Sequence, residues 1–163
     1  MLTIEPLDVR HNAATARQVL QMQRAAYAVE AALIGSDGIP ALHETVAELR
    51  AARERWLGAR DGDGLVGAVA YDRLDDATLD ICKLVVAPRA FRRGVATALL
   101  NALDTAEPAE RTVVSTGALN TPALRLYERR GFVAVRDVEV APGLRITQLE
   151  RPAPPDAAHY VAP

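Results

Sequence analysis

The chain has 163 residues, of which 50% are hydrophobic and 25% are charged, and this is enough for one globular domain with a sizeable core. A formal net charge of -2 argues against a protein that works mainly by coating nucleic acid or an anionic membrane. The single cysteine, Cys82, excludes an intramolecular disulfide, and with only three histidines beside it no zinc-ligand spacing can be assembled. We therefore expect no metal site.

Two features of the sequence concern its location. No apolar run approaches the roughly 20 residues that a membrane-spanning helix needs. The first residues, MLTIEPLDVRH, have neither the basic nor the apolar region of a signal peptide. We expect a cytoplasmic protein in a reducing compartment, without a membrane or nucleic-acid partner.

The first part of the chain changes from a strand pattern to a helix pattern. Residues 2–7 alternate between apolar and polar types, which predicts a short strand. Apolar residues then recur at helical spacing, which predicts an amphipathic helix over about 12–34 with Gln23 outside its apolar face. Glycines and a proline within 35–40 end this helix, and a second helix is expected over 41–53. The apolar face of the first helix contains Val19, Met22, Ala26, Val29 and Leu33.

The middle of the chain has the pattern of a β-hairpin. Two strand-like stretches, about 56–60 and 65–74, flank the sequence DGDG at 61–64, and Asp-Gly turns are typical of tight hairpins. A calcium loop is the alternative interpretation of these aspartates, but the other carboxylates of an EF-hand loop are missing. The β-branched stretch 78–86, which Pro88 ends, predicts a central strand.

The segment 79–100 combines a strand, a basic glycine-containing turn and a helix that Pro108 ends at the latest. A helix N-terminus offers unpaired N–H donors, and Gly94 lets the backbone come close to an anion. Arg92 and Arg93 add positive charge to this turn. An ordinary strand-to-helix turn with solvated arginines fits the same pattern.

The remaining part of the chain again alternates strand and helix. A short buried strand is expected over 111–116. Thr121 as N-cap, Pro122 at the first helical position and Gly131 just past the end indicate a helix. Two further strands, about 132–140 and 144–149, are expected around a Pro-Gly turn.

The predicted order of elements is therefore βααβββαβαββ. This order is typical of an α/β protein with a mixed sheet and helices on both faces. We expect one domain over 1–150, followed by a Pro/Ala-rich C-terminal tail over 151–163.

Two motifs in this chain resemble a known family. The stretch VVSTGALNTPALRLYERRGF is similar to the part of the GNAT superfamily of acyl-CoA N-acyltransferases that closes the coenzyme site. An asparagine opens its helix and a tyrosine lies near its end, here Asn120 and Tyr127. The earlier stretch resembles the superfamily's strand and basic turn, of the form [Q/R]-x-x-G-x-[G/A], but Phe91 stands at the first basic position. The residues that match are Val86, Pro88, Gly94 and Ala96.

The resemblance implies a GNAT fold of about six to seven strands, with acetyl-CoA bound where the middle of the sheet splays apart. The pantetheine arm of the coenzyme would pair with strand residues Leu84, Val85 and Val86. Asn120 would belong to the same site. The pyrophosphate would lie on the backbone N–H groups of Arg92, Arg93, Gly94, Val95, Ala96 and Thr97.

The resemblance also implies roles near the thioester. Tyr127 would donate a proton to the departing thiolate, although its helical spacing fits a core residue as well. Asp80 would take the proton of the amine, with pairing to Lys83 as the alternative. Strand alternation places Asp80 on the face of Cys82 and Leu84. Cys82 itself is expected to be a core residue.

Candidates for binding the acceptor are Tyr27, Glu30 and His43, with solvated helix faces as the alternative. The leading hypothesis is an acetyl-CoA-dependent N-acetyltransferase that acts by direct attack on the primary amine of a small molecule or peptide. The alternative is a non-catalytic acyl-CoA-binding sensor or interaction module of the same fold. A homodimer is left open.

Overall fold

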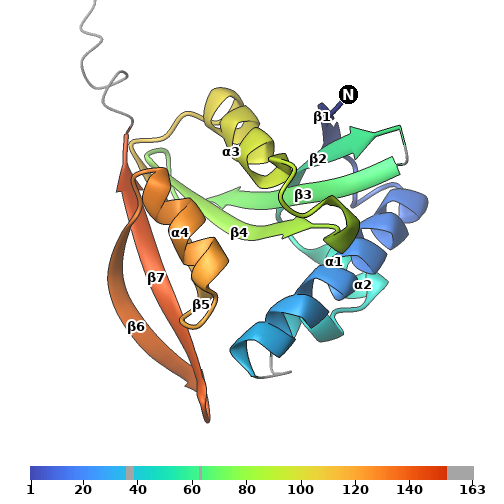
Figure 1. Cartoon of the computed structure of the whole chain (residues 1–163). Helices are drawn as coiled ribbons and strands as arrows, with labels where there is room; N and C mark the ends of the chain where they lie inside the picture. Colours follow the sequence, from blue (N-terminus) through green and yellow to red (C-terminus); the bar gives the residue numbers. More distant parts are fainter. Residues whose placement is uncertain (36–38, 63, 154–163) are drawn as a thin grey trace, which may run out of the picture.

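The computed structural model of the chain describes residues 1–35, 39–62 and 64–153, and these residues build one mixed sheet of seven strands (Figure 1). Neighbouring strands are antiparallel except for β4 and β5, which are parallel. The predicted α/β class, strand number and element order are confirmed. In spatial order the strands are β1 (Thr3–Leu7), β2 (Arg55–Asp61), β3 (Gly64–Arg73), β4 (Thr78–Val86), β5 (Arg111–Gly117), β7 (Leu144–Pro152) and β6 (Val133–Ala141).

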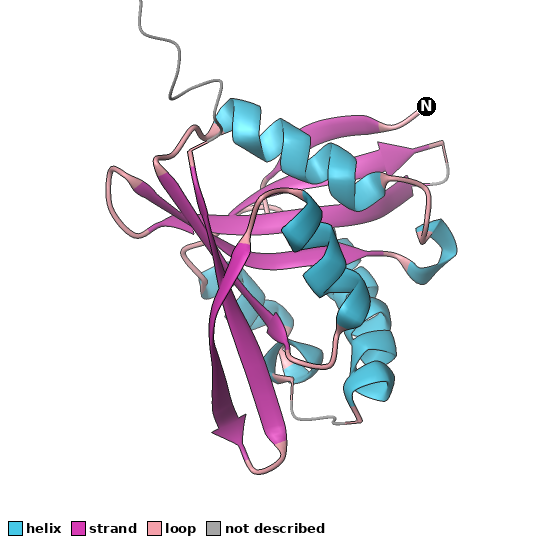
Figure 2. Ribbon diagram, turned by 60° about the vertical axis from the view of Figure 1, so that its left-hand side comes forward, coloured by secondary structure: helices cyan, strands magenta, loops and turns pink. Residues whose placement is uncertain are grey.

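Helices cover both faces of the sheet, as predicted (Figures 1 and 2). One apolar core includes Leu99 of α3, Tyr127 of α4 and Phe132. The other includes Val19 of α1 and Leu49 of α2. The helices are α1 (Ala13–Ile34), α2 (Val46–Ala51), α3 (Val95–Ala106) and α4 (Thr121–Arg129), with 3-10 turns at Pro40–His43 and Pro88–Ala90.

The two halves of the sheet separate between β4 and β5. These strands pair only from Thr78, opposite Arg111, to Ile81, opposite Val114. Beyond Ile81, β4 continues beside β3, while β5 continues beside β7. The strands therefore run apart, as Figure 2 shows. The predicted splay is confirmed, and within the described sheet the second half of β4 keeps one edge without a neighbouring strand.

Two helix starts differ from the prediction because a side chain caps the helix at another residue. Helix α4 has Asn120, not Thr121, as its N-cap, and Asn120 Oδ1 accepts the N–H of Ala123 at 3.3 Å. Helix α2 is shorter than the predicted 41–53, because Thr45 and Glu48 form a capping box at its start. The aspartate at position 63 of the predicted hairpin turn lies outside the described residues.

Helix α1 follows the predicted apolar face only in its first half, where Val19 and Met22 are buried. Gln23 is fully buried, although the pattern placed it outside the apolar face. Val29 and Leu33 were expected in the core but are 43% and 50% exposed. The reason is that the second half of α1 borders the gap between β4 and β5 and does not pack on a complete sheet.

The last described strand passes the predicted end of the domain by two residues. Arg151 of β7 is buried, and its Nη2 lies 2.6 Å from Asp104 Oδ1 of α3. Arg130 also reaches Asp104, at 2.9 Å. These ion pairs join the end of the sheet to α3 and to the end of α4. The division into a domain over 1–150 and a tail over 151–163 stays a prediction.

No helix in the described part of the chain is long and apolar enough to cross a membrane.

Candidate active site

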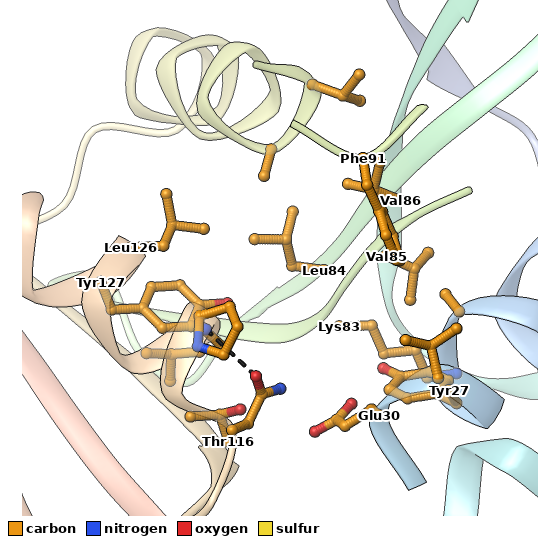
Figure 3. Close-up of a pocket in the computed structure, with 18 of the residues that line it drawn as sticks. Tyr27, Glu30, Lys83, Leu84, Val85, Val86, Phe91, Thr116, Leu126 and Tyr127 are labelled. Atoms are coloured by element: carbon orange, nitrogen blue, oxygen red, sulfur yellow. Dashed lines mark hydrogen bonds between the residues drawn. The ribbon is translucent and has the colours of Figure 1, made fainter. Parts of the chain in front are cut away.

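A cavity of about 890 Å³ lies where β4 and β5 separate. Its walls come from α1, β4, the start of α3, β5 and α4. In Figure 3, Tyr127 lies on one side of the cavity and Tyr27 and Glu30 lie on the other, with Leu84 between them. The predicted site residues that line the cavity are Tyr27, Glu30, Leu84, Val85, Val86, Arg92, Gly94, Val95, Ala96, Thr97, Asn120 and Tyr127.

The start of α3 is suited to an anion. Gly94 is the N-cap, with φ 77°, and no side chain caps this helix. Arg92 also has a left-handed φ, of 64°, and backbones of this kind form concave sites lined by N–H groups. A Cβ built on Gly94 would meet no atom within 4 Å, so there is open space beside the turn. The geometry therefore fits a phosphate at the positive end of the helix.

The hairpin β2–β3 holds two arginines of this turn. Arg89 Nη1 and Arg93 Nη2 lie 3.6 and 3.7 Å from Asp61 Oδ2. Arg93, predicted as a coenzyme ligand, does not line the cavity, whereas Arg92 does. Asp61 thus helps to fix the turn, in part through Arg93, which was expected at the anion.

The free edge of β4 presents backbone groups to the cavity. The N–H of Ala87 donates to the carbonyl of Val66 in β3, at 2.8 Å. Because backbone groups alternate between the two sides of a strand, those of Val86 and Leu84 point toward the gap. An extended ligand can pair with such an edge as an added strand.

Tyr127 is both a core residue and a cavity residue. It is 4% exposed, and its ring meets that of Phe132 edge to face, with centroids 5.4 Å apart. Burial raises the pKa of Tyr127, and the nearby Glu30 raises it further. The phenol therefore keeps its proton at neutral pH and is a weaker acid than a solvent-exposed tyrosine. The two interpretations of this residue from the sequence do not exclude each other.

Glu30 and Tyr27 bring polar groups from α1 to the cavity. Burial raises the pKa of Glu30, while hydrogen bonds with the Asn120 side chain and the Gly117 backbone lower it, and the net shift is upward. Burial also raises the pKa of Tyr27, with Glu30 as the next cause. Asn120 thus connects Glu30 to the start of α4. A carboxylate of raised pKa inside a cavity is suited to accept a proton.

Lys83 carries a buried charge that the sequence analysis did not assign to the site. Its Nζ lies 2.6 Å from Glu44 Oε1, 3.9 Å from Glu54 Oε2 and 5.5 Å from the centre of the Trp56 ring. Gln23 Nε2 donates to the same Glu44 oxygen at 3.1 Å. Gln23, Tyr27 and Glu30 are spaced by four and three residues, so a polar stripe on α1 was a signal in the sequence.

Asp80 is not brought to the cavity. In the β3–β4 pairing Ala70 lies opposite Lys83 and Tyr71 opposite Ile81, so Cys82 is an extra residue, a β-bulge. The bulge breaks the alternation from which Asp80 and Leu84 were expected on one face. Cys82 packs against the core on the α1 side and Leu84 against the core on the α3 side. Asp80 lies on the same side of the strand as Cys82, whose Sγ is 3.8 Å from Asp80 Oδ2.

The candidate His43 and the expected core residue Cys82 both have different surroundings from those predicted. His43 is exposed in the 3-10 turn before α2 and does not line the cavity. Cys82 lines the cavity, but burial and the charge of Asp80 raise the pKa of its thiol to about 12. A thiol that stays protonated is a poor nucleophile. Within the described residues, no group of three or more His, Cys, Asp or Glu side chains could hold a metal ion.

Comparisons with known proteins agree with this geometry. The family model described as an acetyltransferase (GNAT) domain matches residues 52–134. The UPF0157 protein YqkA of Bacillus subtilis (strain 168) is 42% identical over 141 residues, which are 85% of this chain and 41% of YqkA. The chain therefore spans less than half the length of this curated relative.

Solved structures show the same fold at low sequence identity. The ribosomal-protein-S18-alanine N-acetyltransferase of Escherichia coli has a TM-score of 0.72 and 16% identity, with 94% of each chain covered. The PaiA N-acetyltransferase of Thermoplasma acidophilum, solved with coenzyme A, has a TM-score of 0.74 and 12% identity, covering 93% of this chain and 99% of that one. On the family match and the fold together, the chain belongs to the GNAT acetyltransferase family.

Proposed function

We propose that the chain is an acetyl-CoA-dependent N-acetyltransferase that transfers the acetyl group to a primary amine by direct attack. One observation carries this proposal. A single cavity joins the uncapped start of α3, the free edge of β4 and the buried phenol of Tyr127. These are a site for an anion, a site for an extended chain and a proton donor, in one continuous space.

The coenzyme would be held mainly by backbone groups. Its pyrophosphate would accept hydrogen bonds from the N–H groups of the first turn of α3, beside Gly94 and Arg92. Its pantetheine arm would pair with the edge of β4 at Leu84 and Val86. The thioester would then lie near Tyr127, deeper in the cavity.

The reaction needs a neutral amine. At pH 7, an alkylammonium of pKa about 10.4 must lose a proton at a cost of about 4.6 kcal/mol. Glu30 would take this proton. The amine nitrogen then attacks the thioester carbonyl carbon, a C–N bond forms and the C–S bond breaks. The departing sulfur would receive the proton of Tyr127, and the second proton of the amine nitrogen would pass through solvent to restore the phenol. Glu30 would release its proton to solvent, and no covalent enzyme intermediate forms.

Glu30 replaces Asp80 in this proposal. Glu30 lines the cavity, across from Tyr127 (Figure 3). Asp80 lies beyond the bulge at Cys82 and outside the cavity lining. The raised pKa of Glu30 favours proton uptake from the amine.

Coenzyme binding and thiol release test this function together. Acetyl-CoA should raise the melting temperature of the protein, because a ligand that binds the native state stabilises it, and an accepted amine should release free thiol. Gly94→Glu should abolish the thermal shift, because its carboxylate would repel the pyrophosphate. Gly143→Glu, in the turn between β6 and β7, is the matched control, because Gly143 also has a left-handed φ, of 76°, and no atom within 4 Å of a built Cβ; it should retain the shift. A flat melting temperature and flat calorimetry at millimolar acetyl-CoA would refute the function.

A further inference from the structure

The α1 wall of the cavity is apolar and exposed. Val29 and Leu33 are 43% and 50% exposed, and both line the cavity together with Ala26 and Ala32. Large apolar side chains left accessible inside a cavity favour an apolar ligand group. This wall belongs to the same helix as Glu30.

The charged side chains that line the cavity are mostly cationic. Among the described residues that line it, Glu30 is the one carboxylate, whereas Lys83, Arg92 and Arg129 are cationic. Lys83 already contacts Glu44 at 2.6 Å, and Arg92 belongs to the turn before α3. Among the described lining residues, the α1 side of the cavity therefore offers a single anionic group, Glu30, on the same helix as the apolar side chains of Val29 and Leu33.

We propose that the acceptor is a monoamine with an apolar group close to its nitrogen, of the arylalkylamine kind. This inference rests on the proposed function. Glu30 would meet the ammonium group, and Val29 and Leu33 would cover the apolar group. A polyamine or an aminoglycoside would bring further ammonium groups close to the cationic Lys83. The described cavity lining has no carboxylate besides Glu30 to pair with them. An unpaired charge is costly to bury.

The test compares amines in a free-thiol assay with saturating acetyl-CoA. The probes are 2-phenylethylamine, spermidine and kanamycin. We expect kcat/KM for 2-phenylethylamine to exceed both other values by about 10-fold or more, the range of a well-filled apolar contact. A higher kcat/KM for spermidine or kanamycin would overturn the inference. Coenzyme binding without acetylation of 2-phenylethylamine would overturn it as well.

A charge placed on the α1 wall tests whether the acceptor amine binds there. Leu33→Glu should lower kcat/KM for 2-phenylethylamine by about 10-fold and raise the relative rate with spermidine. Leu74→Glu is the matched control, because Leu74 is 57% exposed and does not line the cavity. Equal amine preferences in the two variants would place the acceptor elsewhere. If acetyl-CoA does not bind the wild-type protein, both the proposed function and the acceptor inference are wrong. If acetyl-CoA binds but polycationic amines are the preferred acceptors, only the acceptor inference is wrong.

Discussion

Lys83 Nζ and Glu44 Oε1 lie 2.6 Å apart, although Lys83 is in the central strand β4 and Glu44 directly precedes the cap of α2. The Lys83 side chain is only 8% exposed, and Gln23 of α1 bonds to both residues. The segment directly before α2 is thereby fixed to the sheet and to α1 beside the candidate acceptor site.

Removing one partner of this buried pair should be costly. Lys83→Met leaves the Glu44 and Glu54 carboxylates without their cation, and we expect a loss of about 3–5 kcal/mol in the free energy of unfolding. Urea denaturation measures it. Arg111→Met is the control, because the Arg111 and Glu150 side chains are 50% and 37% exposed and such a pair contributes about 1 kcal/mol or less. Equal losses of unfolding free energy in both variants would show that the Lys83 ion pair contributes no more than an exposed ion pair does.

Gly67 should be intolerant of a side chain. A Cβ there would lie 2.6 Å from Val95 Cγ1 and 3.1 Å from Leu99 Cδ1, so the first turns of α3 approach β3 closely only because position 67 is glycine. Gly67→Ala should lower stability by about 1–3 kcal/mol and weaken coenzyme binding through the displaced start of α3. Gly62→Ala meets no atom within 4 Å and should change neither property. Normal stability of Gly67→Ala would contradict the close packing.

Cys82 should react slowly in the native protein. Burial, with Asp80 close by, raises the pKa of the thiol from 9.0 to about 12, so the reactive thiolate is scarce at pH 8. Alkylation by iodoacetamide should be at least about 100-fold slower in buffer than in 8 M urea. Mass spectrometry over time gives both rates. Comparable rates would mean that Cys82 is an accessible, activated thiol and that its side chain is not protected by its packing against the core.

Glu30 should give a pH-dependent effect on both rate and stability. Its pKa is raised in the folded state, so the folded protein holds this proton more tightly than the unfolded chain does. Ionisation of Glu30 therefore costs stability, and wild type should lose stability relative to Glu30→Gln as the pH rises from about 4 to the raised pKa. The rate deficit of Glu30→Gln should be large near pH 7 and shrink toward pH 10, where solvent supplies neutral amine.

Asp80→Asn is the comparison for Glu30→Gln. Asp80 lies outside the cavity lining, so its variant should show a smaller deficit with no such dependence on pH. A pH-dependent deficit in Asp80→Asn, with none in Glu30→Gln, would return the role of base to Asp80.

Features that depend on local sequence could be predicted. The glycine and proline signals around α4 placed it within one residue, and the Pro142-Gly143 turn between β6 and β7 is present, with Gly143 at φ 76°. The cavity proposed for the coenzyme is lined by residues of two local motifs, at Gly94 and Tyr127. These features depend on backbone preferences of neighbouring residues, which a single sequence contains.

Features that depend on long-range packing could not be predicted. The extra residue Cys82 in β4 moves Leu84 to the opposite face from Asp80, and strand alternation gives no sign of it. Lys83 and Glu44 are 39 positions apart, so their pairing appears only when β4 and the segment before α2 are packed together. Gln23 is buried for the same reason, because its partners Glu44 and Lys83 are distant from it in the sequence.

The kinetics of Tyr127→Phe test the account most directly. The phenol is the proposed proton donor to the thiolate, and phenylalanine keeps the ring contact with Phe132 but removes the hydroxyl. We predict a kcat lower by about 10²-fold, the lower end of the range for acid catalysis, with an unchanged Kd for acetyl-CoA by calorimetry and a melting temperature near that of wild type. An unchanged kcat in this folded variant, measured where chemistry limits the rate, would contradict the account and leave Tyr127 as a core residue alone.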